Sequence, residues 1–186
     1  MPLQHALVAA QPAWLPTRCT TRSRRAARTR VVVPQAFMTK HDPAQLTSAV
    51  ERYVAACNAH DLEGLCSQMS HNVVWSDRVW CSCDLVGPKK VRKVHQELFA
   101  AYPDFTLHTE ELLARGNSNT VALHFTARGT CFGEWRGFPA SGRRSTFSGV
   151  TLFMFDPESN DVIKQIVTYR QPSQEEYAFY LGHEDL

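Results

Sequence analysis

The stretch TVALHFTARGTCFG at residues 120–133 alternates apolar and polar side chains for most of its length. An alternation with period 2 is typical of a β-strand that buries one face. The same pattern occurs in three further segments, at residues 105–113, 144–156 and 162–170. Turn residues separate the segments, at 116–117, 137–142 and 157–161. The second half of the chain therefore predicts four strands joined in a long antiparallel meander.

The segment before this meander predicts three helices. Asp42 and Pro43 are a typical N-cap and first helical residue, and helical spacing of apolar residues continues to about Ala59. A shorter helix follows Asp61, and a third runs from Gly87-Pro88 to just before Pro103. A strand is predicted at residues 73–80, between the second and third helices, and a short helix at 174–181 closes the chain.

Together these elements predict an α+β fold, in which three N-terminal helices pack on a curved antiparallel sheet and a short helix ends the chain. A curved sheet of this kind leaves a conical cavity between itself and the helices. Ligand sites are mostly apolar clefts with a few polar groups, so this cavity is the expected binding site.

Charge is unevenly distributed along the sequence. Residues 1–36 contain six arginines, at 18, 22, 24, 25, 28 and 30, and no acidic residue, whereas residues 37–186 carry a net charge of −4. A cationic segment without acids is typical of an organelle transit peptide, and VVVPQA at 31–36 resembles the end of plastid ones. We therefore expect a transit peptide at 1–36, a single domain at 37–186 and a chloroplast location. The alternatives are a mitochondrial address and a basic arm that binds nucleic acid.

Several other classes of protein are disfavoured. The longest apolar run, Val150–Phe155, is much shorter than the roughly 18–20 residues that cross a bilayer. The acidic net charge of 37–186 argues against a nucleic-acid partner. Cys81 and Cys83 form a C-x-C pair without a matching second pair, so two ordinary thiols are favoured over a redox or soft-metal role. No metal-ligand or cofactor motif is present, and we expect neither a metal nor a cofactor.

Two groups of residues resemble a known family. The run RYV at 52–54, NAHDLEGL at 58–65 and NVVWSD at 72–77 resembles the opening of the NTF2-like superfamily. The run GTCFGEW at 129–135, followed by GFPASGR at 137–143, is similar to its SnoaL-like branch of polyketide and ester cyclases. The resemblance implies the cone-shaped NTF2-like fold. It does not imply one reaction, because the superfamily holds isomerases, dehydratases, cyclases and non-catalytic modules, some of which dimerise through the sheet face.

Asp77 is the first candidate for a catalytic group. Alternation places it on the same strand face as Val73 and Trp75, where loss of water would raise the pKa of a carboxyl group and suit it as a general base. The stretch also resembles ketosteroid isomerase, in which the base lies at this point. That resemblance implies that Tyr53 hydrogen-bonds the developing enolate oxygen, and it places Thr151 where the isomerase has a protonated aspartic acid.

The resemblance has departures that leave other interpretations open. The histidine and aspartate of SnoaL-like cyclases would fall near Thr151 and near 167–168, where no such residues occur. Cys131 also replaces a histidine that is frequent in the family. Asp77 could instead be a structural cap or pair with Arg78 or Arg128, and Tyr53 could be an ordinary core residue.

The remaining candidates would line a pocket for a hydrophobic small molecule. They are the aromatic and histidine side chains Trp75, Phe99, Phe105, His108, His124 and Trp135. The sequence thus supports three hypotheses: a cofactor-independent isomerase, cyclase or hydratase that acts on a carbonyl compound, a small-molecule-binding module, and a dimerisation module of the same fold.

Overall fold

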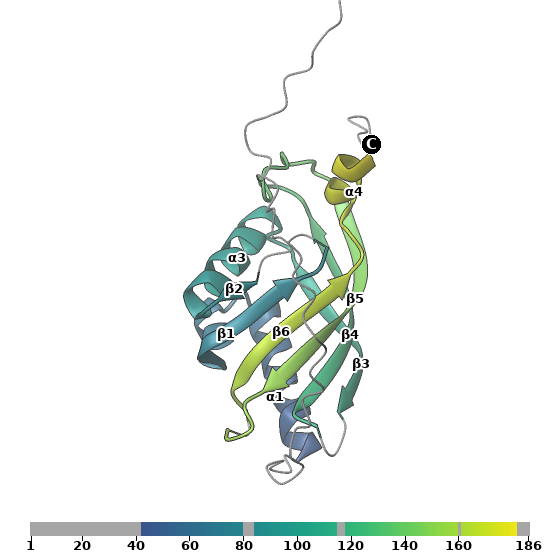
Figure 1. The fold of residues 1–186 in the computed structure, drawn as a ribbon. Coiled ribbons are helices and arrows are strands. Elements are labelled where there is room, and N and C mark those ends of the chain that lie inside the picture. Colours follow the sequence, from purple (N-terminus) through teal and green to yellow (C-terminus); the bar gives the residue numbers. More distant parts are fainter. Residues whose placement is uncertain (1–41, 80–83, 115–117, 160, 182–186) are drawn as a thin grey trace, which may run out of the picture. The chain divides into compact units, whose positions relative to one another are not determined.

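The computed structural model describes residues 42–79, 84–114, 118–159 and 161–181 (Figure 1). Residues 1–41, Trp80, Cys81 and Cys83 lie outside the described ranges, so the interpretations of these residues stay predictions. The α+β fold is confirmed. The elements in chain order are α1 (Pro43–Asn58), α2 (Leu62–Ser67), β1 (Met69–Asp77), β2 (Leu85–Val86), α3 (Pro88–Ala101), β3 (Thr106–Ala114), β4 (Thr120–Thr130), β5 (Arg144–Phe155), β6 (Ile163–Arg170) and α4 (Gln174–Leu181).

The first two helices begin where the sequence predicts, and for the predicted reason. The Asp42 side chain accepts a hydrogen bond from the Ala44 backbone N–H at 3.0 Å, ahead of the proline that opens α1. The Asp61 side chain accepts from the N–H groups of Glu63 and Gly64 at the start of α2. Both carboxylates satisfy helical donors that would otherwise lack a partner.

The sheet is mixed rather than wholly antiparallel, so that part of the prediction was wrong. Its six strands lie in the order β2-β1-β6-β5-β4-β3, and β1 runs parallel to β6. The two-residue strand β2, which the sequence did not predict, pairs antiparallel with the other edge of β1. Alternation identifies a strand but not the direction of its neighbour, which here is set by a strand far away in the sequence.

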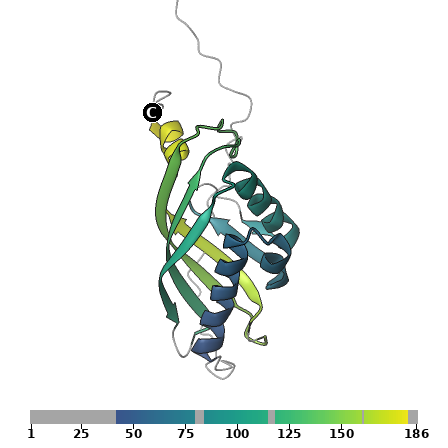
Figure 2. The same cartoon turned by 180° about the vertical axis from the view of Figure 1, so that it is seen from behind.

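Only two of the three helices before β3 pack on the sheet, which also corrects the prediction. Helix α1 packs on β3 and β4, and α3 packs on β1 and β2. Figure 2 shows α1 and α3 on the same side of the curved sheet. Helix α2, of six residues, packs instead on α1 and α3.

The core lies between these two helices and the concave face of the sheet. Along β4, buried residues alternate with more exposed ones as the opening stretch predicts, and Val121, Leu123 and Phe125 are all at most 3% exposed. They meet the buried face of α1, which includes Leu46 and Val50. No helix within the described ranges is both long and apolar enough to span a membrane.

Strands β5 and β6 approach each other closely at Gly149, and this contact can be tested. A Cβ atom at Gly149 would lie 2.5 Å from the Tyr169 carbonyl oxygen and 2.7 Å from Arg170 Cβ. We expect Gly149→Ala to force the strands apart and to lower the free energy of unfolding by about 1–3 kcal/mol. The measurement is urea denaturation. Thr146→Ala, at an exposed position of the same strand, should change stability by less than about 0.5 kcal/mol. Equal midpoints for both variants would contradict this packing.

Candidate functional site

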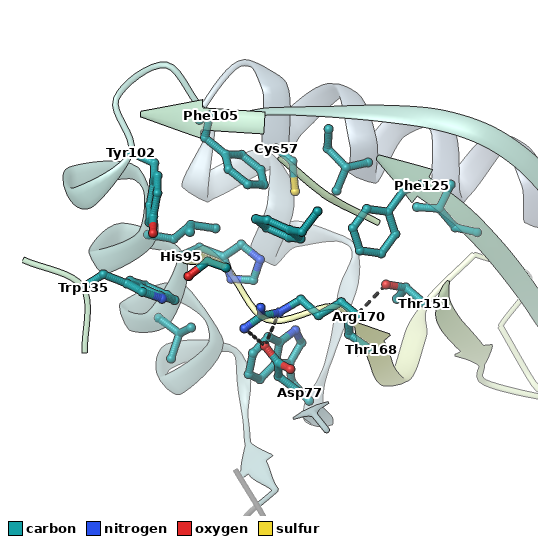
Figure 3. Close-up of a pocket in the computed structure, with 18 of the residues that line it drawn as sticks. Cys57, Asp77, His95, Tyr102, Phe105, Phe125, Trp135, Thr151, Thr168 and Arg170 are labelled. Atoms are coloured by element: carbon teal, nitrogen blue, oxygen red, sulfur yellow. Dashed lines mark hydrogen bonds and ion pairs between the residues drawn. The ribbon is translucent and has the colours of Figure 1, made fainter. Parts of the chain in front are cut away.

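A pocket of about 100 Å³, partly open to solvent, lies between the concave face of the sheet and helices α1 and α3 (Figure 3). Its lining is mainly apolar and rich in aromatic side chains, which come from α1, from the strands and from the loops after α3 and β4. The aromatic wall residues are Tyr53, Trp75, Tyr102, Phe105, Phe125, Trp135, Phe147 and Phe153. Pockets for drug-sized ligands usually measure about 300–1,000 Å³, so this one fits a compact molecule or one end of a longer one.

The three predicted catalytic residues all line this pocket, although they come from different elements. Tyr53 lies on α1, Asp77 ends β1 and Thr151 lies on β5. Each side chain is almost fully buried, with residue exposures of 5%, 4% and 7%. The predicted wall residues Trp75, Phe105 and Trp135 line the pocket as well.

Three other predicted binding residues do not line the pocket. Leu107, Leu123 and Phe125 face it, so His108 and His124, their neighbours along β3 and β4, point to the opposite face and are exposed. Phe99 is buried but stacks on the His60 ring, with ring centroids 4.2 Å apart, and belongs to the core. The two histidine assignments were wrong because the sequence does not show which parity of each strand faces inward, whereas Phe99 lies on α3 and packs in the core.

Asp77 is bound by a cation that the sequence analysis did not identify. Arg170, the last residue of β6, donates from Nε to Asp77 Oδ2 at 2.9 Å, and its Nη2 lies 2.8 Å from the same oxygen. The other oxygen, Oδ1, accepts from the Val79 backbone N–H. Asp77 is therefore a charge-paired carboxylate. The predicted alternative of an ion pair was closer to the structure, although with Arg170 in place of Arg78 or Arg128.

The same guanidinium also holds Glu176 of α4. Arg170 Nη1 and Nη2 donate to the two Glu176 oxygens at 2.7 and 2.8 Å, and Nη1 also reaches the Gln171 carbonyl oxygen. Burial opposes the charge of Glu176, but the hydrogen bonds from Arg170 outweigh it and lower its pKa. Asp77, Arg170 and Glu176 thus form a buried triad, which we call the Arg170 triad.

The Ser173–Glu176 pair fixes the start of α4 over this triad. The Ser173 N–H donates to Glu176 Oε2 at 2.7 Å, and the Glu176 N–H donates to Ser173 Oγ at 3.3 Å. This reciprocal pair is a capping box, in which each side chain satisfies a backbone donor of the other residue. The sequence Ser173-Gln174-Glu175-Glu176 was the available signal for it, and it could have identified Glu176 as the residue that caps the start of α4.

Tyr53 is paired with His95 of α3, another residue that sequence reasoning missed as a site group. The His95 Nδ1 lies 2.9 Å from the Val91 carbonyl oxygen, which can only accept, so Nδ1 carries the proton. Burial lowers the pKa of His95, which is therefore neutral at pH 7, and its Nε2 accepts from the Tyr53 hydroxyl at 3.1 Å. Burial also raises the pKa of Tyr53. The Tyr53 proton is thus directed at His95, whereas the resemblance implied that it points at a ligand.

A second hydroxyl pair lies beside Asp77. Thr168 is the register partner of Asp77 across β1 and β6, and Thr151 is the register partner of Thr168 across β6 and β5. The two threonine oxygens are 3.0 Å apart (Figure 3). Two hydroxyls share one hydrogen bond, so one hydroxyl proton of the pair is left to donate to another group.

The polar groups of the pocket are suited to proton transfer and hydrogen bonding. The buried carboxylate of Asp77 can accept a proton or a hydrogen bond, and the adjacent threonine pair can donate one. In the described ranges, no group of three or more His, Cys, Asp or Glu side chains is placed to hold a metal ion.

Comparison with known proteins identifies the family. Residues 50–162 match the profile of the SnoaL-like domain. The match covers more than half of the chain, and the protein therefore belongs to this family. A search of curated proteins gave no match.

Solved structures with the same fold come from several proteins. AclR from Streptomyces galilaeus, assigned as a hydroxylase, is 22% identical with a TM-score of 0.62, over 76% of this chain and 98% of AclR. A protein assigned as a SnoaL-like polyketide cyclase from Jannaschia sp. CCS1 is 17% identical with a TM-score of 0.61, over 69% and 87%. The epoxide hydrolase/cyclase-like enzyme SalBIII, of pyran ring formation in the polyether salinomycin, is 17% identical with a TM-score of 0.59, over 70% and 93%. At these identities the likeness shows the fold alone.

The Arg170 triad predicts a large effect of removing its cation. Arg170→Met leaves two buried carboxylates without a counterion, and we expect it to lower the free energy of unfolding at pH 7 by about 3–5 kcal/mol. Arg52→Met removes only a half-exposed partner of Asp161, and we expect it to cost about 0–1 kcal/mol. Denaturation in urea at pH 7 measures both.

The pH dependence gives this prediction a second readout. Glu176 has a pKa below its usual value in the folded protein, so its contribution is full above the unfolded value near 4.5 and is lost as the pH falls below it. In Arg170→Met, protonation of the unpaired carboxylates relieves their burial cost. The difference between wild type and variant should therefore shrink as the pH is lowered from 7 to 4. A constant difference would contradict the triad.

Proposed function

We propose that this protein is a cofactor-independent enzyme of the cyclase or isomerase type, which moves a proton on a small, largely apolar molecule held in the pocket. One observation carries the proposal. A buried carboxylate, Asp77, lies at the floor of an aromatic pocket beside a hydroxyl pair that has a proton to donate. A base and a donor that meet one ligand are the minimum set for general acid–base chemistry.

Asp77 is the proposed base. Its Oδ2 is held by Arg170 and its Oδ1 by the Val79 N–H, so the carboxylate is fixed in one orientation toward the pocket. A fixed orientation matters because a general base acts only within hydrogen-bond reach of the proton that it removes.

The Thr151–Thr168 pair is the proposed donor to the oxygen on which charge develops. Tyr53 is less suited to this role, because turning its proton toward a ligand would leave the buried His95 Nε2 without a donor. An unpaired buried acceptor costs about 1–3 kcal/mol. We therefore assign Tyr53 and His95 a role in shaping the pocket wall. Thr151 and Thr168 lie between this wall and Asp77.

A non-catalytic binding module is the second candidate. The observation that favours it is that the charged and phenolic groups lining the pocket are already paired, Asp77 with Arg170 and Tyr53 with His95. A ligand that copurifies with the protein in native mass spectrometry, together with no product from a small-molecule extract of the source cell, would support this alternative.

Asp77→Asn tests the enzyme proposal. We expect it to reduce conversion of the extract component that the wild type converts by about 10²–10⁴-fold, because the amide cannot act as a base. Binding of that component should weaken by no more than about tenfold, because only one hydrogen bond to the side chain at position 77 changes. Conversion is followed by liquid chromatography with mass spectrometry. Asp161→Asn, the same change at an exposed position, serves as the control and should leave the rate unchanged. Wild-type turnover in Asp77→Asn would rule out Asp77 as the base.

We also propose that residues 1–36 direct the protein into the chloroplast, with the mitochondrion as the alternative. The six arginines and the absence of acids in this segment support import. We expect the protein isolated from the source cell to begin near Ala36, and N-terminal sequencing measures this directly. Protein that still carries the segment from Met1 would contradict import. Dimerisation through the sheet face stays a prediction.

A further inference from the structure

The floor of the pocket presents a hydrogen-bond acceptor and a hydrogen-bond donor side by side. Asp77 and Thr168 are register partners on adjacent parallel strands, which lie about 4.8 Å apart. Both side chains line the pocket, as does Thr151, to which Thr168 is hydrogen-bonded. Figure 3 shows these side chains on the same side of the pocket.

Among the described residues, the partners of Asp77 leave one of its acceptor positions open. A carboxylate accepts about four hydrogen bonds. Oδ2 contacts two nitrogens of Arg170, and Oδ1 accepts one bond from the Val79 N–H. The remaining position is a lone pair on Oδ1, and it can be filled only by a group that carries a hydrogen.

Arg170 cannot serve as the recognition group for an anionic ligand. Each of its three guanidinium nitrogens is already engaged by an oxygen of Asp77, Gln171 or Glu176, and its side chain is 8% exposed. An anion that entered here would instead meet the Asp77 carboxylate. Arg136 also lines the pocket, where its guanidinium lies 4.7 Å from the centroid of the Trp135 ring. Next to Asp77, the negative charge of the carboxylate disfavours carboxylates, phosphates and preformed enolates.

The Tyr53 oxygen adds a second acceptor to the same pocket. Its proton is donated to His95 Nε2, so the phenol oxygen can only accept further hydrogen bonds, and Cys57, which also lines the pocket, is hydrogen-bonded to it. A bare carbonyl satisfies neither this oxygen nor Asp77. A hydroxyl group satisfies the acceptor and the donor beside each other at once, because it donates to the carboxylate of Asp77 and accepts from a threonine hydroxyl.

We propose, building on the proposed function, that the group of the substrate that reaches Asp77 is a neutral hydroxyl, as in a phenol, an enol or an alcohol carried on a compact apolar ring. The ring fits the aromatic walls and the volume of about 100 Å³, and the hydroxyl fits the floor between Asp77 and Thr168. The enzyme thus selects its ligand in the protonated form.

The test uses 4-nitrophenol as the probe, because its phenolate is yellow and its neutral form is not. The full-length protein is added at the pH at which half of the free probe is ionised. Preference for the neutral hydroxyl predicts that the yellow absorbance falls in a saturable manner, since binding raises the apparent pKa of the probe. A site that acts as an anion-binding donor pocket predicts the opposite, a rise in the absorbance, and this would overturn the proposal.

A matched ligand and two matched variants complete the test. 4-Nitroanisole, which has a methyl group in place of the acidic hydrogen, should bind at least about tenfold more weakly by NMR titration. Asp77→Asn should lose the fall in absorbance, whereas Asp161→Asn should keep it. If Asp77→Asn does not fold, the direction of the wild-type change still decides the question. Equal binding of phenol and anisole, or no saturable binding of the phenol, would also overturn the proposal.

This experiment measures binding and not turnover. A phenolate preference would therefore refute the ligand class and leave the role of Asp77 as a base to be decided by the turnover of Asp77→Asn. If Asp77→Asn keeps wild-type turnover while the preference for neutral hydroxyls is confirmed, the two results together support the binding module.

Discussion

The buried guanidinium of Arg170 is the interaction on which the rest of the site depends. It contacts Asp77 at the end of β1, Glu176 in the first turn of α4 and the Gln171 carbonyl. Two carboxylates that are each almost fully buried are tolerated only because a cation lies between them, since an unpaired buried charge is very costly. The side chain of Arg170 therefore joins strand β1, strand β6 and helix α4.

This arrangement requires the parallel pairing of β1 with β6. That pairing places Thr168 opposite Asp77, and the antiparallel pairing of β6 with β5 then places Thr151 opposite Thr168. Arg170 follows two residues later on the same strand face and returns to Asp77. Helix α4 is held over the same region by a second carboxylate, Glu175, which accepts from Ser141, Ser145 and Tyr102. Three strands and one helix thus meet around Asp77.

Sequence patterns predicted the parts of this structure that depend on local chemistry. Alternation along 73–77 correctly placed Asp77 and Trp75 on the inner face, and Asp42 and Asp61 cap the helices that they were predicted to begin. The position of Arg170 could not be predicted, because an arginine at the end of an alternating strand is usually exposed and only the parallel partner explains its burial. The assignment of His108 and His124 to the pocket was wrong for a related reason, since a strand pattern defines two faces but does not show which one faces the interior.

The dual role of Arg170 also limits how such a site can change. Replacing Asp77, Arg170 or Glu176 alters the stability of the fold together with the chemistry, because the same hydrogen bonds serve both. Phe125 in the aromatic wall carries no such constraint, since it touches the pocket through apolar surface that can be exchanged for other apolar surface at modest cost. Differences in ligand within this architecture should therefore arise in the walls, while the proposed hydroxyl-binding pair of Asp77 and Thr168 is retained.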